Sequence, residues 1–85
     1  MRFIVIFKPT ASKELQQLPK KDSDKILEEI TLLESNPFPV GCKKLSGEEN
    51  KWRIRIGDYR VLYEINFEQT FIRIYRIKHR KDVYR

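Results

Sequence analysis

Residues 52–63 read WRIRIGDYRVLY, an alternating pattern that predicts a β-hairpin. Before the turn, apolar residues fall on one side of an extended strand, and Arg53 and Arg55 fall on the other. Gly57-Asp58 is a typical tight turn, and the residues after it are rich in Val, Tyr and Ile, as strands are. The hairpin therefore has one apolar face and one basic face.

Further strands are predicted on both sides of this hairpin. Its second strand extends over residues 59–67, Glu68-Gln69 turns the chain, and residues 71–77 form a third antiparallel strand. The apolar run at residues 3–7 ends at Lys8-Pro9 and predicts an opening strand. The sequence thus supplies four strands for one sheet.

Between the opening strand and the hairpin, residues 9–36 predict two short helices joined at Pro19. Proline disfavours helix in the residue before it but suits the first turn of a new helix. Ser35-Asn36-Pro37 ends the second helix. Apolar residues recur at helical spacing in both halves: Ala11, Leu15 and Leu18, then Ile26, Leu27, Ile30, Leu32 and Leu33.

The order of these elements predicts the fold class. Helices come early and most strands follow, which is typical of an α+β fold. We expect a single domain over residues 1–85, in which the N-terminal strand and a three-strand antiparallel meander form one four-stranded sheet. The αα-hairpin should cover the apolar face of this sheet, and the face that carries the arginines should be open.

The basic charge is concentrated in the second half of the chain. Residues 1–50 carry eight basic and eight acidic side chains, whereas residues 51–85 carry ten basic and four acidic ones, so the net charge of +6 arises there. Most of these bases lie in or beside predicted strands, which favours a shaped surface for a polyanion over a loose basic tail. A merely solvated basic face is the alternative.

Composition argues against several other classes of protein. The only cysteine, Cys42, excludes an internal disulfide framework, and with a single histidine the chain predicts no metal site and no bound cofactor. The glycines form no phosphate-cradling loop. The N-terminal apolar run is too short for a signal sequence or a membrane span, so we expect a cytoplasmic protein without membrane contact.

Three arginines of the hairpin are candidate phosphate ligands. Arg53 and Arg55 project from one face of a strand about 7 Å apart, close to the spacing of successive phosphates in a single-stranded nucleic acid. A guanidinium group binds phosphate oxygens in a bidentate manner. Arg60 follows the turn, at the edge of the same face. The alternatives are ordinary ion pairs, between a strand arginine and Glu64 and between Arg60 and Asp58.

The C-terminal string HRKDVY, residues 79–84, holds the densest set of groups suited to RNA cleavage. Attack by the RNA's own 2′-hydroxyl needs a base, an acid for the leaving 5′-oxygen, and positive charge beside the phosphate. His79 can act as acid or base, Arg80 can stabilise the phosphate, and Tyr84 can stack on a base or transfer a proton. A surface histidine without function is the alternative.

Residues 44–47, 52–63 and 79–84 together resemble the RelE-like toxins of bacterial and archaeal toxin–antitoxin systems. The resemblance implies a barnase-like RelE fold and ribosome-dependent cleavage of messenger RNA in the decoding A site, which leaves a 2′,3′-cyclic phosphate and a 5′-hydroxyl. It also implies an acidic, RelB-like antitoxin that masks the basic face and mainly sets the oligomeric state.

Two groups of site residues follow. The predicted catalytic residues are His79, Arg80, Arg60 and Tyr84, and the predicted RNA-binding residues are Lys51, Arg53, Arg55, Arg76, Lys78 and Lys81. In the catalytic group, the two arginines match phosphate-binding arginines of the family, and Tyr84 matches a base-stacking tyrosine. Arg53 and Arg55 stand where well-known members have lysines. Because arginine stays protonated and is a poor general base, His79 is expected to take the acid–base role.

ParE-like members of the same superfamily share the fold but poison DNA gyrase, and they tend to lack this set of arginine, histidine and tyrosine residues. The presence of the set favours the nuclease. Two alternatives stay open: a gyrase inhibitor, and a catalytically silent member that only binds RNA or antitoxin.

Overall fold

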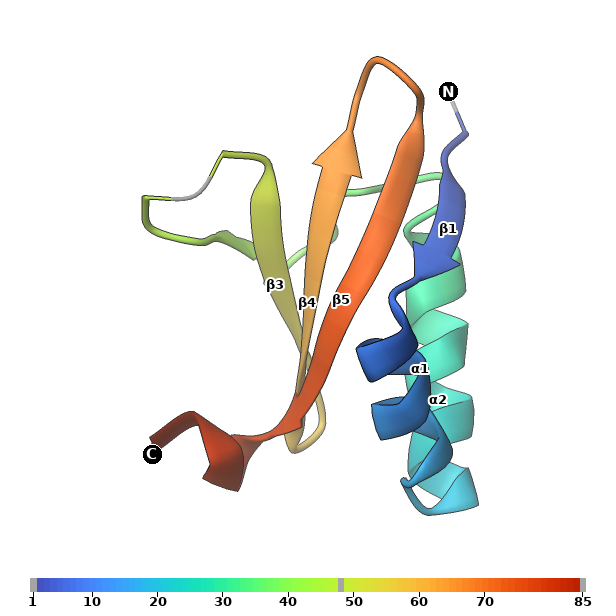
Figure 1. Cartoon of the computed structure of the whole chain (residues 1–85), viewed down its shortest axis with the longest axis vertical. Helices are drawn as coiled ribbons and strands as arrows, with labels where there is room; N and C mark the ends of the chain where they lie inside the picture. Colours follow the sequence, from blue (N-terminus) through green and yellow to red (C-terminus); the bar gives the residue numbers. More distant parts are fainter. Residues whose placement is uncertain (1, 48, 85) are drawn as a thin grey trace.

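The computed structural model describes residues 2–47 and 49–84, apart from the side chains of residues 83 and 84. The described chain has two helices, five strands and a final short 3₁₀ helix, η1 (Figure 1). In order, these elements are β1 (Ile4–Phe7), α1 (Pro9–Gln16), α2 (Lys20–Leu32), β2 (Lys43–Lys44), β3 (Lys51–Ile56), β4 (Tyr59–Asn66), β5 (Phe71–His79) and η1 (Arg80–Tyr84). The predicted α+β fold class is confirmed.

The strands form one sheet in the order β1-β5-β4-β3-β2. β1 pairs with β5 in parallel, and the other neighbours are antiparallel. The prediction of four strands was therefore one short. The missed strand, β2, has only two residues, Lys43 and Lys44, which pair with Arg53 and Trp52 of β3. A strand of this length leaves no alternating pattern in a sequence.

The predicted break between the two helices and the predicted hairpin turn are both confirmed. Pro19 is the N-cap of α2 and separates it from α1. Gly57 begins the turn between β3 and β4 with a φ of 59°, a left-handed conformation that glycine adopts without strain. The turn brings the basic residues of the two strands onto one face.

Both helices pack on one side of the sheet, as predicted (Figure 1). Ile26, Ile30 and Leu33 are buried, each at most 2% exposed. Leu27 and Leu32 were expected in the same stripe, but they are 40% and 58% exposed. Each is adjacent in sequence to a buried residue. Successive side chains of an α-helix point about 100° apart around the helix axis, so the neighbour of a buried residue points away from the sheet. No helix in the described part of the chain is long and apolar enough to cross a membrane.

The core is built from branched apolar side chains of the central strands. Ile74 lies opposite Tyr63, but the next partners are Leu62 and Arg76, so the register shifts by one residue at Tyr75. This β-bulge lets Ile74 and Ile77, three residues apart, both face the core. The buried residues of β3, β4 and β5 are Ile54, Ile56, Val61, Tyr63, Ile65, Ile72, Ile74 and Ile77. Each fully buried aliphatic side chain contributes about 1.5–3 kcal/mol.

Candidate nucleic-acid interface

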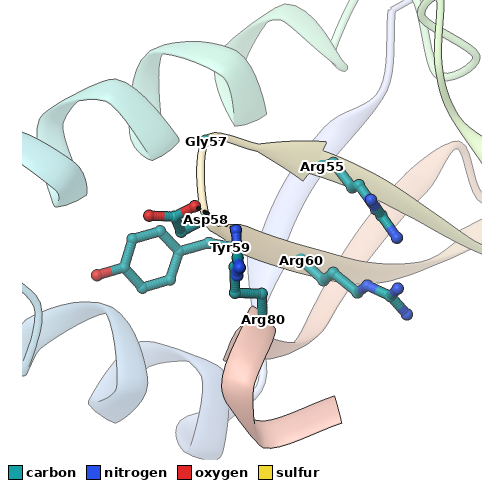
Figure 2. A pocket seen from close by; sticks show the side chains of 6 residues that line it. All are labelled: Arg55, Gly57, Asp58, Tyr59, Arg60 and Arg80. Atoms are coloured by element: carbon teal, nitrogen blue, oxygen red, sulfur yellow. Dashed lines mark ion pairs between the residues drawn. The ribbon is translucent and has the colours of Figure 1, made fainter. Parts of the chain in front are cut away.

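Three basic side chains form a row across the open face of the sheet. Arg55 of β3 lies opposite Arg60 of β4, and Arg60 lies opposite Lys78 of β5. Directly opposed residues of antiparallel strands project from the same face, so these side chains are neighbours. Figure 2 shows Arg55 and Arg60 extending in the same direction from adjacent strands. We call Arg55, Arg60 and Lys78 the cation row.

A second line of residues runs beside the cation row. Arg53 lies opposite Leu62, which in turn lies opposite Arg76. On its other side, Arg53 lies opposite Lys43 of β2, which is exposed. Lys43 was not among the predicted site residues, because the sequence around it has no strand pattern. The adjacent lysines at residues 43 and 44 were the available signal.

The charges on this face repel one another. The pKa of Arg53 lies below its ordinary value, first because the side chain is partly buried and then because of the charges of Arg55 and Arg60. Like charges directly opposed across a sheet are destabilising. An anion that contacts several of these cations at once would relieve the repulsion.

Glu64 and Asp58, the carboxylates that could have paired with the hairpin arginines, pair with other residues. Glu64 pairs with Arg73, with 3.3 Å between Oε1 and Nη1. Asp58 pairs with Arg80. Within residues 2–47 and 49–84, none of the three hairpin arginines has a carboxylate partner. The alternatives left open by the sequence are therefore not realised in the described chain.

Beside the turn, the cation row borders a hollow of about 320 Å³. The residues that line it are Arg55, Gly57, Asp58, Tyr59, Arg60 and Arg80 (Figure 2). The backbone places Arg80 there, because its N–H donates to the carbonyl of Asp58 at 2.7 Å. The guanidinium of Arg80 lies 3.6 Å from the Asp58 carboxylate, and both side chains are largely exposed. Such a pair is worth only about 0–1 kcal/mol, so a phosphate can replace the carboxylate.

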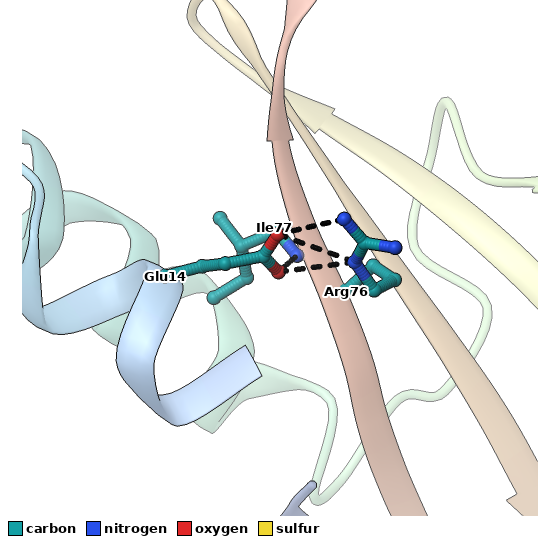
Figure 3. Close-up of polar contacts among 3 residues, drawn as sticks. All are labelled: Glu14, Arg76 and Ile77. Carbon is teal, nitrogen blue, oxygen red and sulfur yellow. Dashed lines mark hydrogen bonds and ion pairs between the residues drawn. The ribbon is translucent and has the colours of Figure 1, made fainter. Parts of the chain in front are cut away.

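Two other predicted RNA-binding residues are engaged within the protein. Arg76 donates to the Glu14 carboxylate of α1 at 3.0 and 3.2 Å, and the same carboxylate accepts the backbone N–H of Ile77 at 2.7 Å (Figure 3). The Lys51 ammonium lies 5.3 Å from the centre of the Tyr75 ring. Arg76 thus joins α1 to the sheet, whereas no residue of the cation row has an ion pair with another described residue.

His79 lies apart from Arg60, with which it was predicted to form a catalytic group. It is opposite Tyr59, and it lines a second hollow of about 280 Å³ that also includes residues of α2. Lys78 lies opposite Arg60, so the next residue, His79, projects from the other face of the sheet, together with Tyr59. The bulge at Tyr75 explains this placement, because it shifts the alternation of β5 by one residue.

η1 carries the remaining predicted residues. Lys81 is exposed, and its backbone N–H donates to Nδ1 of His79 at 3.1 Å. The side chain of Tyr84 lies outside the described residues.

The fold is shared with solved toxin structures. An archaeal RelE–RelB complex from Pyrococcus horikoshii superimposes with a TM-score of 0.83 and 35% identity, over 94% of this chain and 97% of that chain. The toxin–antitoxin complex RelBE2 from Mycobacterium tuberculosis gives 0.81 and 30%, over 93% and 99%. Isolated Escherichia coli RelE, at 20% identity and a TM-score of 0.81 over 96% and 90%, shows the fold alone. The architecture is that of a RelE-type toxin.

Sequence comparison agrees with the structural one. A family model described as the ParE toxin of type II toxin–antitoxin systems matches residues 5–84. Toxin RelG of M. tuberculosis is 37% identical over 100% of this chain and 99% of its own length. Putative toxin RelE1 of Methanocaldococcus jannaschii is 33% identical over 100% and 98%. The chain therefore belongs to the RelE/ParE superfamily of toxins of type II toxin–antitoxin systems.

Proposed function

We propose that this protein is an endoribonuclease toxin that cleaves messenger RNA on the ribosome. The observation that supports this most is the cation row with Arg53 beside it, whose arginines have no carboxylate partner within the described residues. Repulsion among these cations destabilises the folded state of the free protein. The regularly spaced negative charges of a phosphate backbone would relieve that repulsion. A polyanion is therefore a better ligand than a small neutral molecule.

In the proposed reaction, the 2′-oxygen of one nucleotide attacks the adjacent phosphorus, and the bond from phosphorus to the 5′-oxygen breaks. The products are a 2′,3′-cyclic phosphate and a 5′-hydroxyl. Arg60 and Arg80, which line the same hollow, would stabilise the charge that builds on the phosphate oxygens. Removal of one such donor typically lowers the rate by about 10²–10³-fold. Arg53 and Arg55 would hold the flanking phosphates.

The proton transfers need other groups, because a guanidinium keeps its protons at neutral pH. Tyr84, in η1, is proposed to stack on the substrate base and to take part in proton transfer. The acid–base role expected for His79 would require its ring to leave Tyr59, which it contacts edge to face. Arginine electrostatics thus carry most of the proposed catalysis.

The ribosome and a RelB-like antitoxin are the proposed partners. The P. horikoshii relative was solved as a complex of RelE with RelB. An acidic antitoxin segment would neutralise the cation row and compete with RNA for it. Binding would then silence the toxin through occupancy of the same face.

Inhibition of DNA gyrase is the second candidate function, because the matching family model is described as a ParE toxin. It needs no phosphate chemistry, so the arginines of the hollow would matter only as contacts. The relatives at 33% and 37% identity carry RelE-type names, which favours the nuclease.

Purified protein distinguishes the two candidates. In a cell-free translation reaction, the wild type should stop protein synthesis and generate messenger RNA fragments with 5′-hydroxyl ends, and it should leave DNA supercoiling by gyrase unchanged. Arg60→Ala should reduce RNA cleavage by about 100-fold. Lys20→Ala, which removes an exposed cation of α2, is the matched control and should keep full activity. If the wild type inhibited supercoiling by gyrase and left messenger RNA intact, the nuclease proposal would be overturned.

A further inference from the structure

His79 is held in place at the end of β5. Its Nδ1 accepts the backbone N–H of Lys81 at 3.1 Å, and its ring meets Tyr59 edge to face with 5.2 Å between the ring centres. The Tyr59 hydroxyl in turn donates to the Asp22 carboxylate of α2 at 3.0 Å. A line of contacts therefore runs from α2 through two rings to the backbone of η1.

This line of contacts ends next to Arg80. The N–H of Arg80 donates to the Asp58 carbonyl at 2.7 Å, and the following N–H, of Lys81, donates to His79. Two successive backbone groups are thus fixed, one by the β3–β4 turn and one by the imidazole. Together they set the direction in which the Arg80 side chain leaves the sheet and enters the hollow.

We infer that His79 is a positioning residue, which orients η1 through its contact with the Lys81 N–H so that Arg80 faces the hollow beside the cation row. Its effect on RNA cleavage rests on the proposed function. The contact requires an unprotonated Nδ1, which places the proton of the neutral ring on Nε2. An acid–base role would instead require the ring to reach a phosphate on the opposite face of the sheet, where Arg60 lies.

Two variants separate positioning from proton transfer. His79→Asn places an amide oxygen on the same atom, Cγ, that carries Nδ1, so it can accept the Lys81 N–H but cannot act as acid or base near neutral pH. His79→Phe keeps a ring against Tyr59 but has no acceptor. Two readouts are needed: the kcat and KM of messenger RNA cleavage on programmed ribosomes, and amide hydrogen exchange in the free protein by NMR.

Positioning predicts different results for the two variants. His79→Asn should stay within about threefold of the wild type in both readouts. His79→Phe should lower kcat roughly tenfold with little change in KM, and the Lys81 amide should exchange roughly tenfold faster, as expected for one lost hydrogen bond. Unchanged amide shifts in β3 and β4 would show that the variant is folded.

Other results would overturn the inference. An equal loss of kcat in both variants, with Lys81 exchange unchanged in His79→Asn, would assign proton transfer to His79. Unchanged Lys81 exchange in His79→Phe would show that the imidazole does not hold η1. If the wild type cleaves no RNA, the proposed function fails, but the exchange measurement still tests the positioning contact separately.

Discussion

Arg55 lies directly opposite Arg60 across the β3–β4 ladder, and no carboxylate within the described residues pairs with either side chain. Charged pairs across an antiparallel ladder are worth roughly 0.2–1 kcal/mol, and pairs of like charge are unfavourable. The proposed site therefore costs folding stability, which is a common property of functional sites. Stability and activity should respond in opposite directions when one of these charges is removed.

Arg55→Gln should raise the free energy of unfolding by about 0.5 kcal/mol at low salt while it weakens RNA cleavage. Urea unfolding monitored by fluorescence of Trp52 measures the first effect. Arg73→Gln is the matched control, since its arginine is paired with Glu64, and it should not stabilise the protein. Destabilisation by Arg55→Gln would show that the repulsion is already relieved in the free protein.

Binding to single-stranded RNA should depend steeply on salt. Each phosphate contact contributes about −0.7 to the slope of log Kobs against log salt, so Arg53, Arg55, Arg60 and Arg80 together predict a slope of roughly −3. Fluorescence anisotropy with a short labelled RNA measures it. Arg80→Ala should make the slope shallower by about 0.7, and Lys20→Ala should leave it unchanged. A flat response in the wild type would argue against a phosphate-binding face.

The Glu14 carboxylate should matter more for stability than for RNA binding. Glu14→Ala leaves the Ile77 N–H without its acceptor and Arg76 without its ion pair, so the free energy of unfolding should fall by about 2–3 kcal/mol. Glu14→Gln keeps an acceptor for Ile77 and should lose only about 1 kcal/mol. Asp24→Ala, which breaks a pair with the fully exposed Lys20, should leave the free energy of unfolding nearly unchanged. Similar losses in Glu14→Ala and Asp24→Ala would contradict this role.

Tyr63 should make the fold sensitive to alkali. Its hydroxyl donates to the Pro37 carbonyl at 2.7 Å, and its pKa is raised well above the ordinary value, first by burial and then by the neighbouring Cys42. Above pH 10 the unfolded chain loses the Tyr63 proton while the folded chain keeps it. The contribution of Tyr63 is therefore fully present below pH 10 and falls by about 1.4 kcal/mol per pH unit above it.

Tyr63→Phe tests whether Tyr63 causes the predicted loss of stability above pH 10. At pH 7 the variant should be less stable by about 1 kcal/mol, because the hydrogen bond to Pro37 is lost. Above pH 10 the difference from the wild type should narrow, since phenylalanine does not titrate. Parallel stability curves for the two proteins between pH 7 and 11 would rule out Tyr63 as the source of the alkaline loss.

Much of the fold follows from local patterns in the sequence. The alternation around Arg53 fixes which side of β3 is basic, and Pro19 separates the helices, because both signals act over a few neighbouring residues. β2 could not be predicted, because it has only two residues, Lys43 and Lys44, and is defined by its pairing with β3. Leu27 was expected in the core but is exposed. Hydrophobicity alone does not say which of two adjacent apolar residues of a helix faces the sheet.

The candidate site was predictable in part for the same reason. Period-two alternation places Arg53 and Arg55 on one face, and the structure adds Lys43 beside them. His79 was grouped with the arginines, but the bulge at Tyr75 turns it toward Tyr59. A bulge depends on pairing between two strands, so the sequence of β5 alone does not reveal it.

Primer extension on a defined messenger RNA, with and without ribosomes, tests the nuclease directly. The purified wild type should produce cuts in phase with codons, and only when ribosomes are present. Arg60→Ala and Arg80→Ala should each reduce these cuts by about 100-fold, whereas Lys20→Ala should retain them. An intact messenger RNA after incubation of the wild type with translating ribosomes would contradict the proposal that the cation row serves RNA cleavage.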